Sequence, residues 1–230
     1  MCVPINSKKL HQEILKDSIA ALLHHSKNVK KRQFVETVEI HFGLKNFDPA
    51  RDKRLQGQTS LPHAPRKKFR CLVLGNEEHL DEAKALGLDS RSLDELKKIN
   101  RDKKIVKNLA KSYDQLIASA TIIRQVPRLL GPTLNKMGKF PAAMRPNEKI
   151  QERVEGMNKQ VKFSVKFKVG APMCMSGPVG HVEMTPEQLE ENITATVNYV
   201  ISLMKKSWQN VKKVKFFTLV RNKMSIHINF

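Results

Sequence analysis

SLPHAPRKKFRCLVLG, residues 60–75, changes character halfway along. Its first part, SLPHAPRKK (60–68), contains two prolines and a run of basic residues, which is typical of a linker. The second part, FRCLVLG (69–75), is too apolar for a strand with one solvated face, and it predicts a strand buried on both faces. The stretch therefore predicts a domain boundary followed directly by the first strand of a parallel sheet.

The residues after this strand alternate between helical and strand-like patterns. DQLIAS (114–119) predicts a second apolar strand. Helices are predicted around 77–86, 92–98, 101–111 and 121–131. Because strands that alternate with helices form βαβ units, we expect a parallel sheet covered on both faces in the middle of the chain.

Both ends of the chain show a different pattern. FVETVEIHF (34–42) and VKFSVKFKV (161–169) alternate polar with apolar residues, which predicts half-buried strands. Amphipathic helices are predicted at 7–25, with Leu10, Ile14, Ile19, Leu22 and Leu23 as its apolar residues, and at 185–206. The second helix begins with a capping box at Thr185 and Gln188. The economical interpretation is one domain made of both termini, with a second domain inserted in it.

The charge of the chain favours a polyanionic partner. Its 42 lysines and arginines against 22 acids give a net charge of +20 among 230 residues and a pI near 10.0. Nucleic acid is the commonest partner for such a field. Three cysteines without metal-ligand spacing argue against a disulfide framework or a zinc site. No stretch predicts a signal peptide or a membrane span, so we expect a soluble cytosolic or nuclear protein.

Catalytic patterns are weak. In RLLGPTLNKMGKFP (128–141), six residues separate Gly131 from Gly138, and Phe140 stands where a P-loop needs a hydroxyl residue. The chain also lacks GxGxxG, GxSxG and HExxH motifs. We therefore expect no enzyme, no cofactor, no metal site and no small-molecule substrate.

A binding surface is the stronger hypothesis. Thr37, Glu39 and His41 form the polar face of the strand at 34–42, and the basic residues Lys30, Lys31 and Arg32 precede it. The polar loop at 45–54 ends with Arg54. The C-terminal strand is expected beside them, presenting Thr218 and Arg221. Basic side chains supply affinity for phosphate, and short hydroxyl and carboxylate side chains suit RNA 2′-hydroxyls and base edges.

Five motifs together resemble the "L-one" family of large-subunit ribosomal proteins, in its eukaryotic "ten-a" form, over nearly the whole chain. They are FVETVEIHFGLKNFDPARDKR, LKKINRDKKIVKNLAKSYD, RLLGPTLNKMGKFP, VGHVEMTPEQLEENI and SLMKKSWQNVK. The resemblance implies an α/β protein with a discontinuous α+β RNA-binding domain, placed at 1–66 and 157–230, and an inserted Rossmann-like domain at 67–156.

The resemblance also implies a function. It is that of a structural protein which binds the stalk of large-subunit rRNA at the ribosomal exit site and assists release of deacylated tRNA during translation. The expected partners are the rRNA stalk, exit-site tRNA and the ribosome, with no membrane. The expected location is the cytoplasm, on the ribosome, with passage through the nucleolus during assembly.

The family's main rRNA contacts map onto two places in this sequence. The first is Phe34, Thr37 and Glu39; the family's basic residue before that phenylalanine is Gln33 here. The second is a Ser-Thr-Met-Gly motif, whose positions hold Thr218, Leu219, Val220 and Arg221. Arginine fills space that glycine would leave open to RNA. In the signature, Gly131 and Gly138 shape a turn, and Lys136 and Lys139 are candidate tRNA contacts.

Three hypotheses stay open on the sequence alone. The first is the ribosomal protein just described. The second, favoured by the altered motif at 218–221, is a divergent or assembly-stage relative that binds precursor RNA through the same fold. An enzyme that uses the central parallel sheet as a nucleotide site is a distant third.

Overall fold

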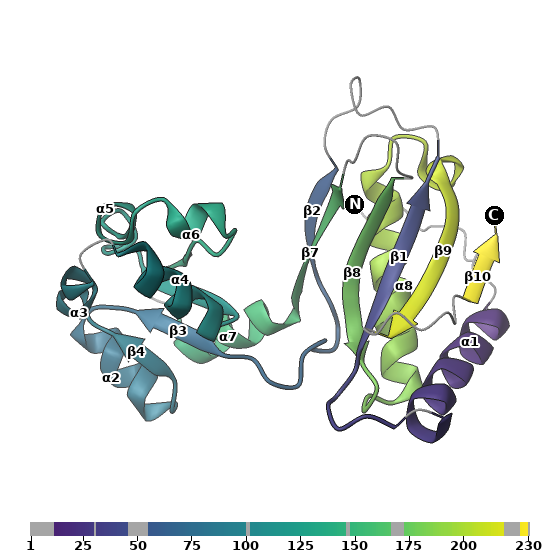
Figure 1. The fold of residues 1–230 in the computed structure, drawn as a ribbon, viewed down its shortest axis with the longest axis horizontal. Coiled ribbons are helices and arrows are strands. Elements are labelled where there is room, and N and C mark those ends of the chain that lie inside the picture. Colours follow the sequence, from purple (N-terminus) through teal and green to yellow (C-terminus); the bar gives the residue numbers. More distant parts are fainter. Residues whose placement is uncertain are drawn as a thin grey trace. The chain divides into compact units, whose positions relative to one another are not determined.

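The computed structural model describes residues 12–29, 31–45, 55–99, 102–145, 148–166, 173–218 and 226–229. The chain forms two compact units, each with its own core. Residues 1–67 and 159–230 form the first, here called the terminal unit, and residues 68–158 form the second, the inserted unit. Figure 1 shows both units as ribbons.

The terminal unit is built on a six-stranded sheet with the order β10-β9-β1-β8-β7-β2. All of its neighbouring strands pair antiparallel. The strands are β1 (Thr37–Leu44), β2 (Gln56–Ser60), β7 (Gln160–Lys166), β8 (Cys174–His181), β9 (Val211–Thr218) and β10 (Ile226–Asn229). Strands from both ends of the chain thus share one sheet, and β1 lies between β8 and β9.

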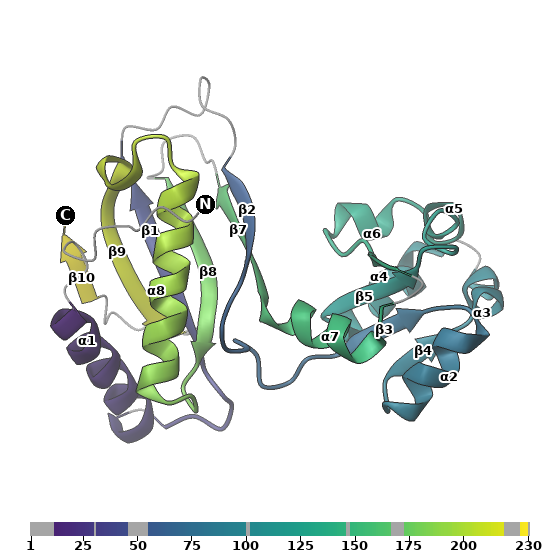
Figure 2. The same cartoon turned by 180° about the vertical axis from the view of Figure 1, so that it is seen from behind.

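Two helices cover one face of this sheet. α8 (Pro186–Leu203) crosses it, and α1 (Gln12–His24) packs beside α8, as the view in Figure 2 shows. α1 continues into a π-helical turn, η2 (His25–Val29), and a 3-10 turn, η3 (Ser207–Asn210), follows α8. The expected capping box at Thr185 and Gln188 is present. The apolar sides of the helices and strands form one core, which leaves the opposite face of the sheet uncovered by these helices.

Two details differ from the expectation in this unit. Ile14, expected in the buried stripe of the first helix, is 46% exposed, because α1 turns Leu15, Ile19 and Leu23 toward the core instead. The first strand begins at Thr37, so the residues expected at its start precede it.

A buried amide holds the linker before the inserted unit. Asn192 of α8 is 0% exposed, and its side chain accepts a bond from the His63 backbone N–H at 3.0 Å. The same amide donates to the carbonyls of His63 at 3.1 Å and Val179 at 2.8 Å. Leu61 is also buried in this core. The proline-rich stretch at 60–68 therefore docks on the terminal unit before the chain enters the inserted unit.

The inserted unit contains a parallel sheet with the order β4-β3-β5-β6. Its strands are β3 (Cys71–Leu74), β4 (Asp89–Arg91), β5 (Gln115–Ser119) and β6 (Ala142–Met144). Its helices are α2 (Glu77–Ala85), α3 (Leu93–Lys98), α4 (Lys103–Ser112), α5 (Val126–Leu130), α6 (Thr133–Lys136) and α7 (Ile150–Lys159). The short strands β4 and β6 and the helix α7 were not predicted from the sequence.

Two cores lie on opposite faces of this sheet. Leu72 and Leu74 of β3 face a core shared with α3, α4, α5 and α6, whereas Cys71 and Val73 face a core shared with α2 and α7. All four residues are buried, as the apolar run at 69–75 predicts. The fold class is confirmed: one chain combines an antiparallel α+β sheet with a parallel α/β sheet. In the part of the chain that is described, no helix is long and apolar enough to span a membrane.

Candidate nucleic-acid interface

The uncovered face of the terminal sheet is polar. Register pairing places Glu39 and His41 of β1 on this face, opposite Phe217 and Lys215 of β9. Their burial alternates along β1, with polar residues half-exposed and apolar residues buried. The described polar residues of this face are Thr37, Glu39, His41, Gln56, Gln58, Ser60, Gln160, Lys162, Ser164, Ser176, His181, Lys213 and Lys215. A broad face of amides, hydroxyls and cations suits RNA, which offers phosphates, 2′-hydroxyls and base edges.

The acid on this face is already bonded. Glu39 is the only carboxylate among the face residues just given, and its Oε2 lies 3.1 Å from Nε2 of His41. The His41 ring packs edge-on against Phe217 with ring centroids 4.7 Å apart. Lys215 Nζ lies 6.0 Å from the centroid of the same Phe217 ring. The strand pair β1–β9 thus presents an aromatic ring beside a cation, a combination that stacks on bases and attracts phosphate.

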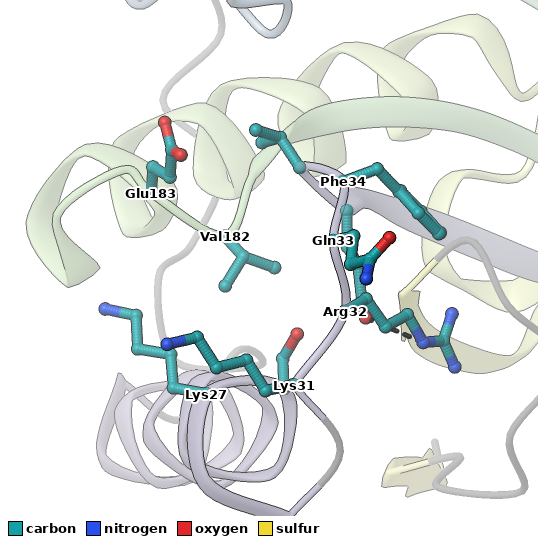
Figure 3. A pocket seen from close by; sticks show the side chains of 10 residues that line it. Lys27, Lys31, Arg32, Gln33, Phe34, Val182 and Glu183 are labelled. Carbon is teal, nitrogen blue, oxygen red and sulfur yellow. Dashed lines mark ion pairs between the residues drawn. The ribbon is translucent and has the colours of Figure 1, made fainter.

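An open hollow of about 440 Å³ lies next to the start of β1. Figure 3 shows that Lys27 and Lys31 extend along one side of it, while Arg32 and Phe34 lie together on the opposite side. Val182 and Glu183, which follow β8, complete the wall. The lining residues are Ser26, Lys27, Lys31, Arg32, Gln33, Phe34, Val35, Glu36, Val182 and Glu183.

Arg32 is held by a buried carboxylate. Its Nε lies 3.0 Å from Oε1 of Glu36, and the two side chains are 12% and 5% exposed. The Glu36 backbone carbonyl accepts from the Val182 N–H at 3.0 Å, which fixes the same segment to the end of β8. Nη1 of Arg32 is buried and has no hydrogen-bond partner among the described residues. The ion pair therefore fixes the guanidinium in one orientation beside the Phe34 ring.

The sequence leaves open whether Phe34 is buried or exposed, and the structure shows that its side chain is exposed. Its parity with Val38 and Ile40 suggests a core residue, but it is 53% exposed because it precedes the strand. The Arg32 guanidinium carbon lies 5.9 Å from the centroid of its ring. An exposed ring beside a cation is a platform on which an unpaired base can stack.

The hollow has an excess of positive charge. Its two acids are paired, Glu36 with Arg32 and Glu183 with Lys67, whose Nζ lies 2.5 Å from Oε2 of Glu183. The Lys67 bond holds the pKa of Glu183 below its ordinary value, so that the carboxylate stays ionised and neutralised by its partner. Lys27 and Lys31 have no such acid among the described residues, and they leave the hollow basic.

The charge of the whole chain is concentrated in the same unit. The terminal unit has 24 lysines and arginines against 10 acids, a net charge of +14, and the inserted unit has 18 against 12, a net charge of +6. The uneven division places most of the net charge in the unit that contains the uncovered sheet and the hollow.

The predicted site residues divide into three groups. Lys31, Arg32 and Phe34 lie together in the hollow, and Thr37 and Glu39 lie on the adjoining uncovered face. Thr218 ends β9 and is the register partner of Val38, so the C-terminal strand does lie beside β1 as expected. The predicted residues Lys30, Arg54, Leu219, Val220 and Arg221 lie outside the described residues.

The signature at 128–141 lies in the inserted unit, in the loops around α5 and α6. Gly131 and Gly138 have φ of 68° and 69°, in the left-handed region that favours glycine. Lys139 is engaged in the fold, because its Nζ donates to the carbonyls of Ala110 at 2.7 Å and Tyr113 at 2.6 Å at the end of α4. Lys136, by contrast, is exposed. The signature therefore ties its loop to α4 through a cation at the helix C-terminus.

Sequence reasoning missed several cations on the terminal sheet. Lys162, Lys213 and Lys215 share the uncovered face, and Lys27 lines the hollow. The alternation in VKFSVKFKV predicted β7, and β9 was expected as the C-terminal strand, but only the strand order places their lysines on the same face as Glu39. No group of three or more metal-ligating side chains occurs within the described ranges.

Comparison with known proteins identifies the family. The description "Ribosomal protein L1p/L10e family" matches residues 22–218. The chain belongs to this family. It is 45% identical over 208 residues to the large ribosomal subunit protein uL1 of Spodoptera frugiperda, covering 90% of this chain and 94% of that one. It is 46% identical over 204 residues to uL1 of Oryza sativa subsp. japonica, covering 89% and 92%.

Membership agrees with the resemblance found in the sequence. A third relative, uL1 of Drosophila melanogaster, is 45% identical over 208 residues, with 90% and 94% of the two chains covered. The family consists of ribosomal proteins rather than enzymes, which confirms the expectation that the chain is not an enzyme. The family match ends at Thr218, directly before the altered residues 219–221.

Proposed function

We propose that this protein is a structural constituent of the large ribosomal subunit and that its terminal unit binds stalk rRNA. The observation that carries the proposal is the basic hollow beside the uncovered polar sheet, in a member of a ribosomal protein family. The exposed Lys27 and Lys31 supply ammonium groups for phosphate, and Phe34 supplies an exposed ring. The lysines of β7 and β9 extend the basic surface across the sheet.

In this function the hollow and the sheet have different roles. The hollow combines a fixed guanidinium with an exposed ring, so it can hold a distorted or unpaired nucleotide in one orientation. The uncovered sheet presents short polar side chains at regular spacing, and it can follow the RNA backbone and its 2′-hydroxyls. We propose residues 1–66 and 157–230 as the rRNA-binding domain and residues 67–156 as the inserted domain.

The finer parts of the proposal follow from the resemblance. The protein caps a stalk of rRNA at the exit site, and it assists release of deacylated tRNA, with Lys136 of the inserted unit on the tRNA side. It works on cytoplasmic ribosomes and passes through the nucleolus during assembly.

A gradient profile of the tagged protein tests the proposal. The expected result is co-sedimentation with large subunits and polysomes. Binding of the purified chain to a stalk rRNA fragment should weaken steeply with salt, because phosphate contacts release counterions. Normal expression without co-sedimentation, or a flat salt response, would overturn it.

The altered residues at 218–221 favour a second candidate, an assembly-stage relative that binds precursor rRNA. This candidate predicts the protein in nucleolar precursors and its absence from polysomes. Replacing Arg221 with glycine restores the family's residue at this position and tests the effect of the altered motif directly. If the arginine blocks close approach of the backbone to RNA, Arg221→Gly raises affinity for stalk rRNA. An unchanged affinity means that the altered motif does not limit binding.

A further inference from the structure

The helix α4 (Lys103–Ser112) places its charges differently from its neighbours. α2 and α3 have two acids each in the first turn and lysine in the last turn, the arrangement that the helix dipole favours. α4 has no acid in its first turn, which contains Lys103 and Lys104. Asp102 caps the helix by accepting from the Lys104 N–H at 2.9 Å. Two ammonium groups thus stand at the positive end of the helix dipole.

The exposed lysines of α4 form a single row. Lys103, Lys107 and Lys111 follow one another at four-residue steps of about 6 Å along the helix axis. Lys104 lies beside this row, one residue on from Lys103. The buried residues Val106, Leu109 and Ala110 take the other side of the helix, and all four lysines are exposed. We call these four residues the α4 lysine row.

This arrangement lowers the stability of the helix. Like charges at i,i+4 disfavour a helix by about 0.2–0.5 kcal/mol per pair, and the row contains two such pairs. The lysines of α2 and α3 are offset by acids: Lys84 lies 3.3 Å from Asp81, and Lys97 lies 2.9 Å from Asp94. No lysine of the row has an ion pair with a described residue. Packing of the inserted unit does not require the row, so a ligand is the better explanation.

The row consists of lysine alone, which restricts the kind of ligand. Lysine is a point charge on a flexible stem, whereas arginine recognises bases and phosphates through a planar fork. Phosphate contacts position a nucleic acid but do not specify its sequence. Such a row therefore suits an RNA partner whose sequence differs from one binding event to the next, rather than a single rRNA site.

We propose that the α4 lysine row binds the phosphate backbone of exit-site tRNA. This inference rests on the proposed function, in which the terminal unit holds stalk rRNA and tRNA is the partner of variable sequence. The exposed Lys136 belongs to the signature loop that Lys139 bonds to the end of α4. Lys136 thus adds an exposed cation to the loop that Lys139 bonds to the C-terminal end of α4.

The experiment compares two triple variants of the full chain. K103Q/K107Q/K111Q removes three of the four lysines of the row, and K84Q/K97Q/K98Q removes three exposed lysines from α2 and α3 as the matched control. Each protein is titrated against mixed deacylated tRNA and, separately, against a stalk rRNA fragment over a range of salt. The row variant should bind tRNA roughly tenfold more weakly or worse, and the slope of log K against log salt should fall by about 2 to 3. Stalk RNA binding should be unchanged in both variants.

The outcomes separate this inference from the proposed function. An equal loss of tRNA affinity in both triple variants, or no loss in either, overturns the assignment of the row. A loss of stalk RNA affinity in the row variant assigns the row to rRNA and overturns the tRNA assignment. If the wild-type chain binds tRNA through the row but does not bind stalk RNA, the proposed rRNA function fails and this inference stands. Circular dichroism of both variants checks that the fold is retained.

Discussion

The hollow of the terminal unit and the lysine row of the inserted unit are both basic, but they are built in opposite ways. In the hollow the acids are paired, Arg32 is fixed by buried Glu36, and Phe34 adds a ring. On α4 the lysines are exposed, have no acid partner among the described residues and lie on a regular helix. The hollow is preorganised by its ion pair, whereas the lysine row consists of flexible charged side chains.

This contrast predicts a different mode of RNA binding for each of the two surfaces. A fixed guanidinium and an aromatic ring lose little conformational freedom on binding, and they can recognise a particular RNA shape. A flexible lysine row attracts any phosphate backbone, binds it weakly and releases it easily as salt rises. We therefore expect a stable contact at the hollow and a transient one at the row.

The largest effect is expected from breaking the buried ion pair. Arg32→Ala leaves Glu36 buried without its partner, which lowers the free energy of unfolding of the terminal unit by about 3 kcal/mol. Chemical denaturation followed by fluorescence measures this, because Trp208 is the single tryptophan and packs against the terminal core.

Two controls test the physical reason. Lys67→Ala breaks the exposed pair with Glu183, whose side chains are 53% and 48% exposed, and should change stability by less than about 0.5 kcal/mol. R32M/E36L replaces the buried pair with apolar groups and should recover most of the stability without recovering the affinity for stalk RNA. Equal destabilisation by Arg32→Ala and Lys67→Ala would contradict the role given to the buried carboxylate.

The next effect concerns binding alone. Phe34→Ala should leave stability nearly unchanged, since the ring is 53% exposed, but should weaken binding of stalk RNA by about 1–3 kcal/mol through the loss of base stacking. Phe140→Ala is the matched control, because Phe140 is 42% exposed in the inserted unit. A fluorescence anisotropy titration measures both. If the two variants bind stalk RNA equally well, Phe34 is not a stacking platform.

Much of the fold follows from local sequence patterns. The apolar run at 69–75 predicts a fully buried strand, and the capping box at Thr185 predicts the start of α8, because both signals lie within one element. The strands β4 and β6 are three residues each and carry no periodic signal of their own. They form because parallel neighbours supply their hydrogen bonds, which the local sequence does not record.

The candidate site is less predictable because it depends on register and pairing. The alternation of Thr37, Glu39 and His41 identified the polar face of one strand from the sequence. The lysines of β7 and β9 join that face only through the strand order, and Phe34 leaves the core because the strand begins three residues later. The bond from Lys139 to the end of α4 spans 29 residues, beyond any local pattern.

A smaller effect is expected from the lysines of the uncovered sheet. K213Q/K215Q removes two cations of β9, and the salt slope for stalk RNA should fall by about 1.5 to 2, with a modest loss of affinity at low salt. K103Q/K107Q, the corresponding double change on α4, should leave this slope unaltered. A change of equal size in both double variants would mean that stalk RNA extends over both units.

The smallest effect is expected on the rate of thiol labelling. It is measured for Cys71 and Cys174 in a Cys2→Ser background. Burial raises the pKa of Cys71 to about 12, so at pH 8 only about one thiol in ten thousand is ionised. Iodoacetamide, which reacts with the thiolate, should therefore label Cys71 only after unfolding. Cys174 is half-buried in β8, and its Sγ lies 4.0 Å from Nδ1 of His41. Labelling of Cys174 in the folded chain should proceed and should slow when stalk RNA is bound.

The same pKa sets a pH limit on the test. The folded state holds the Cys71 proton up to about pH 12, whereas the unfolded thiol releases it near pH 9.0. Raising the pH above that value therefore favours unfolding of the inserted unit, and labelling must be done below it. Slowing of Cys174 by stalk RNA but not by mixed tRNA would place only the first RNA on the uncovered sheet. Slowing by both RNAs would remove the distinction between the two surfaces.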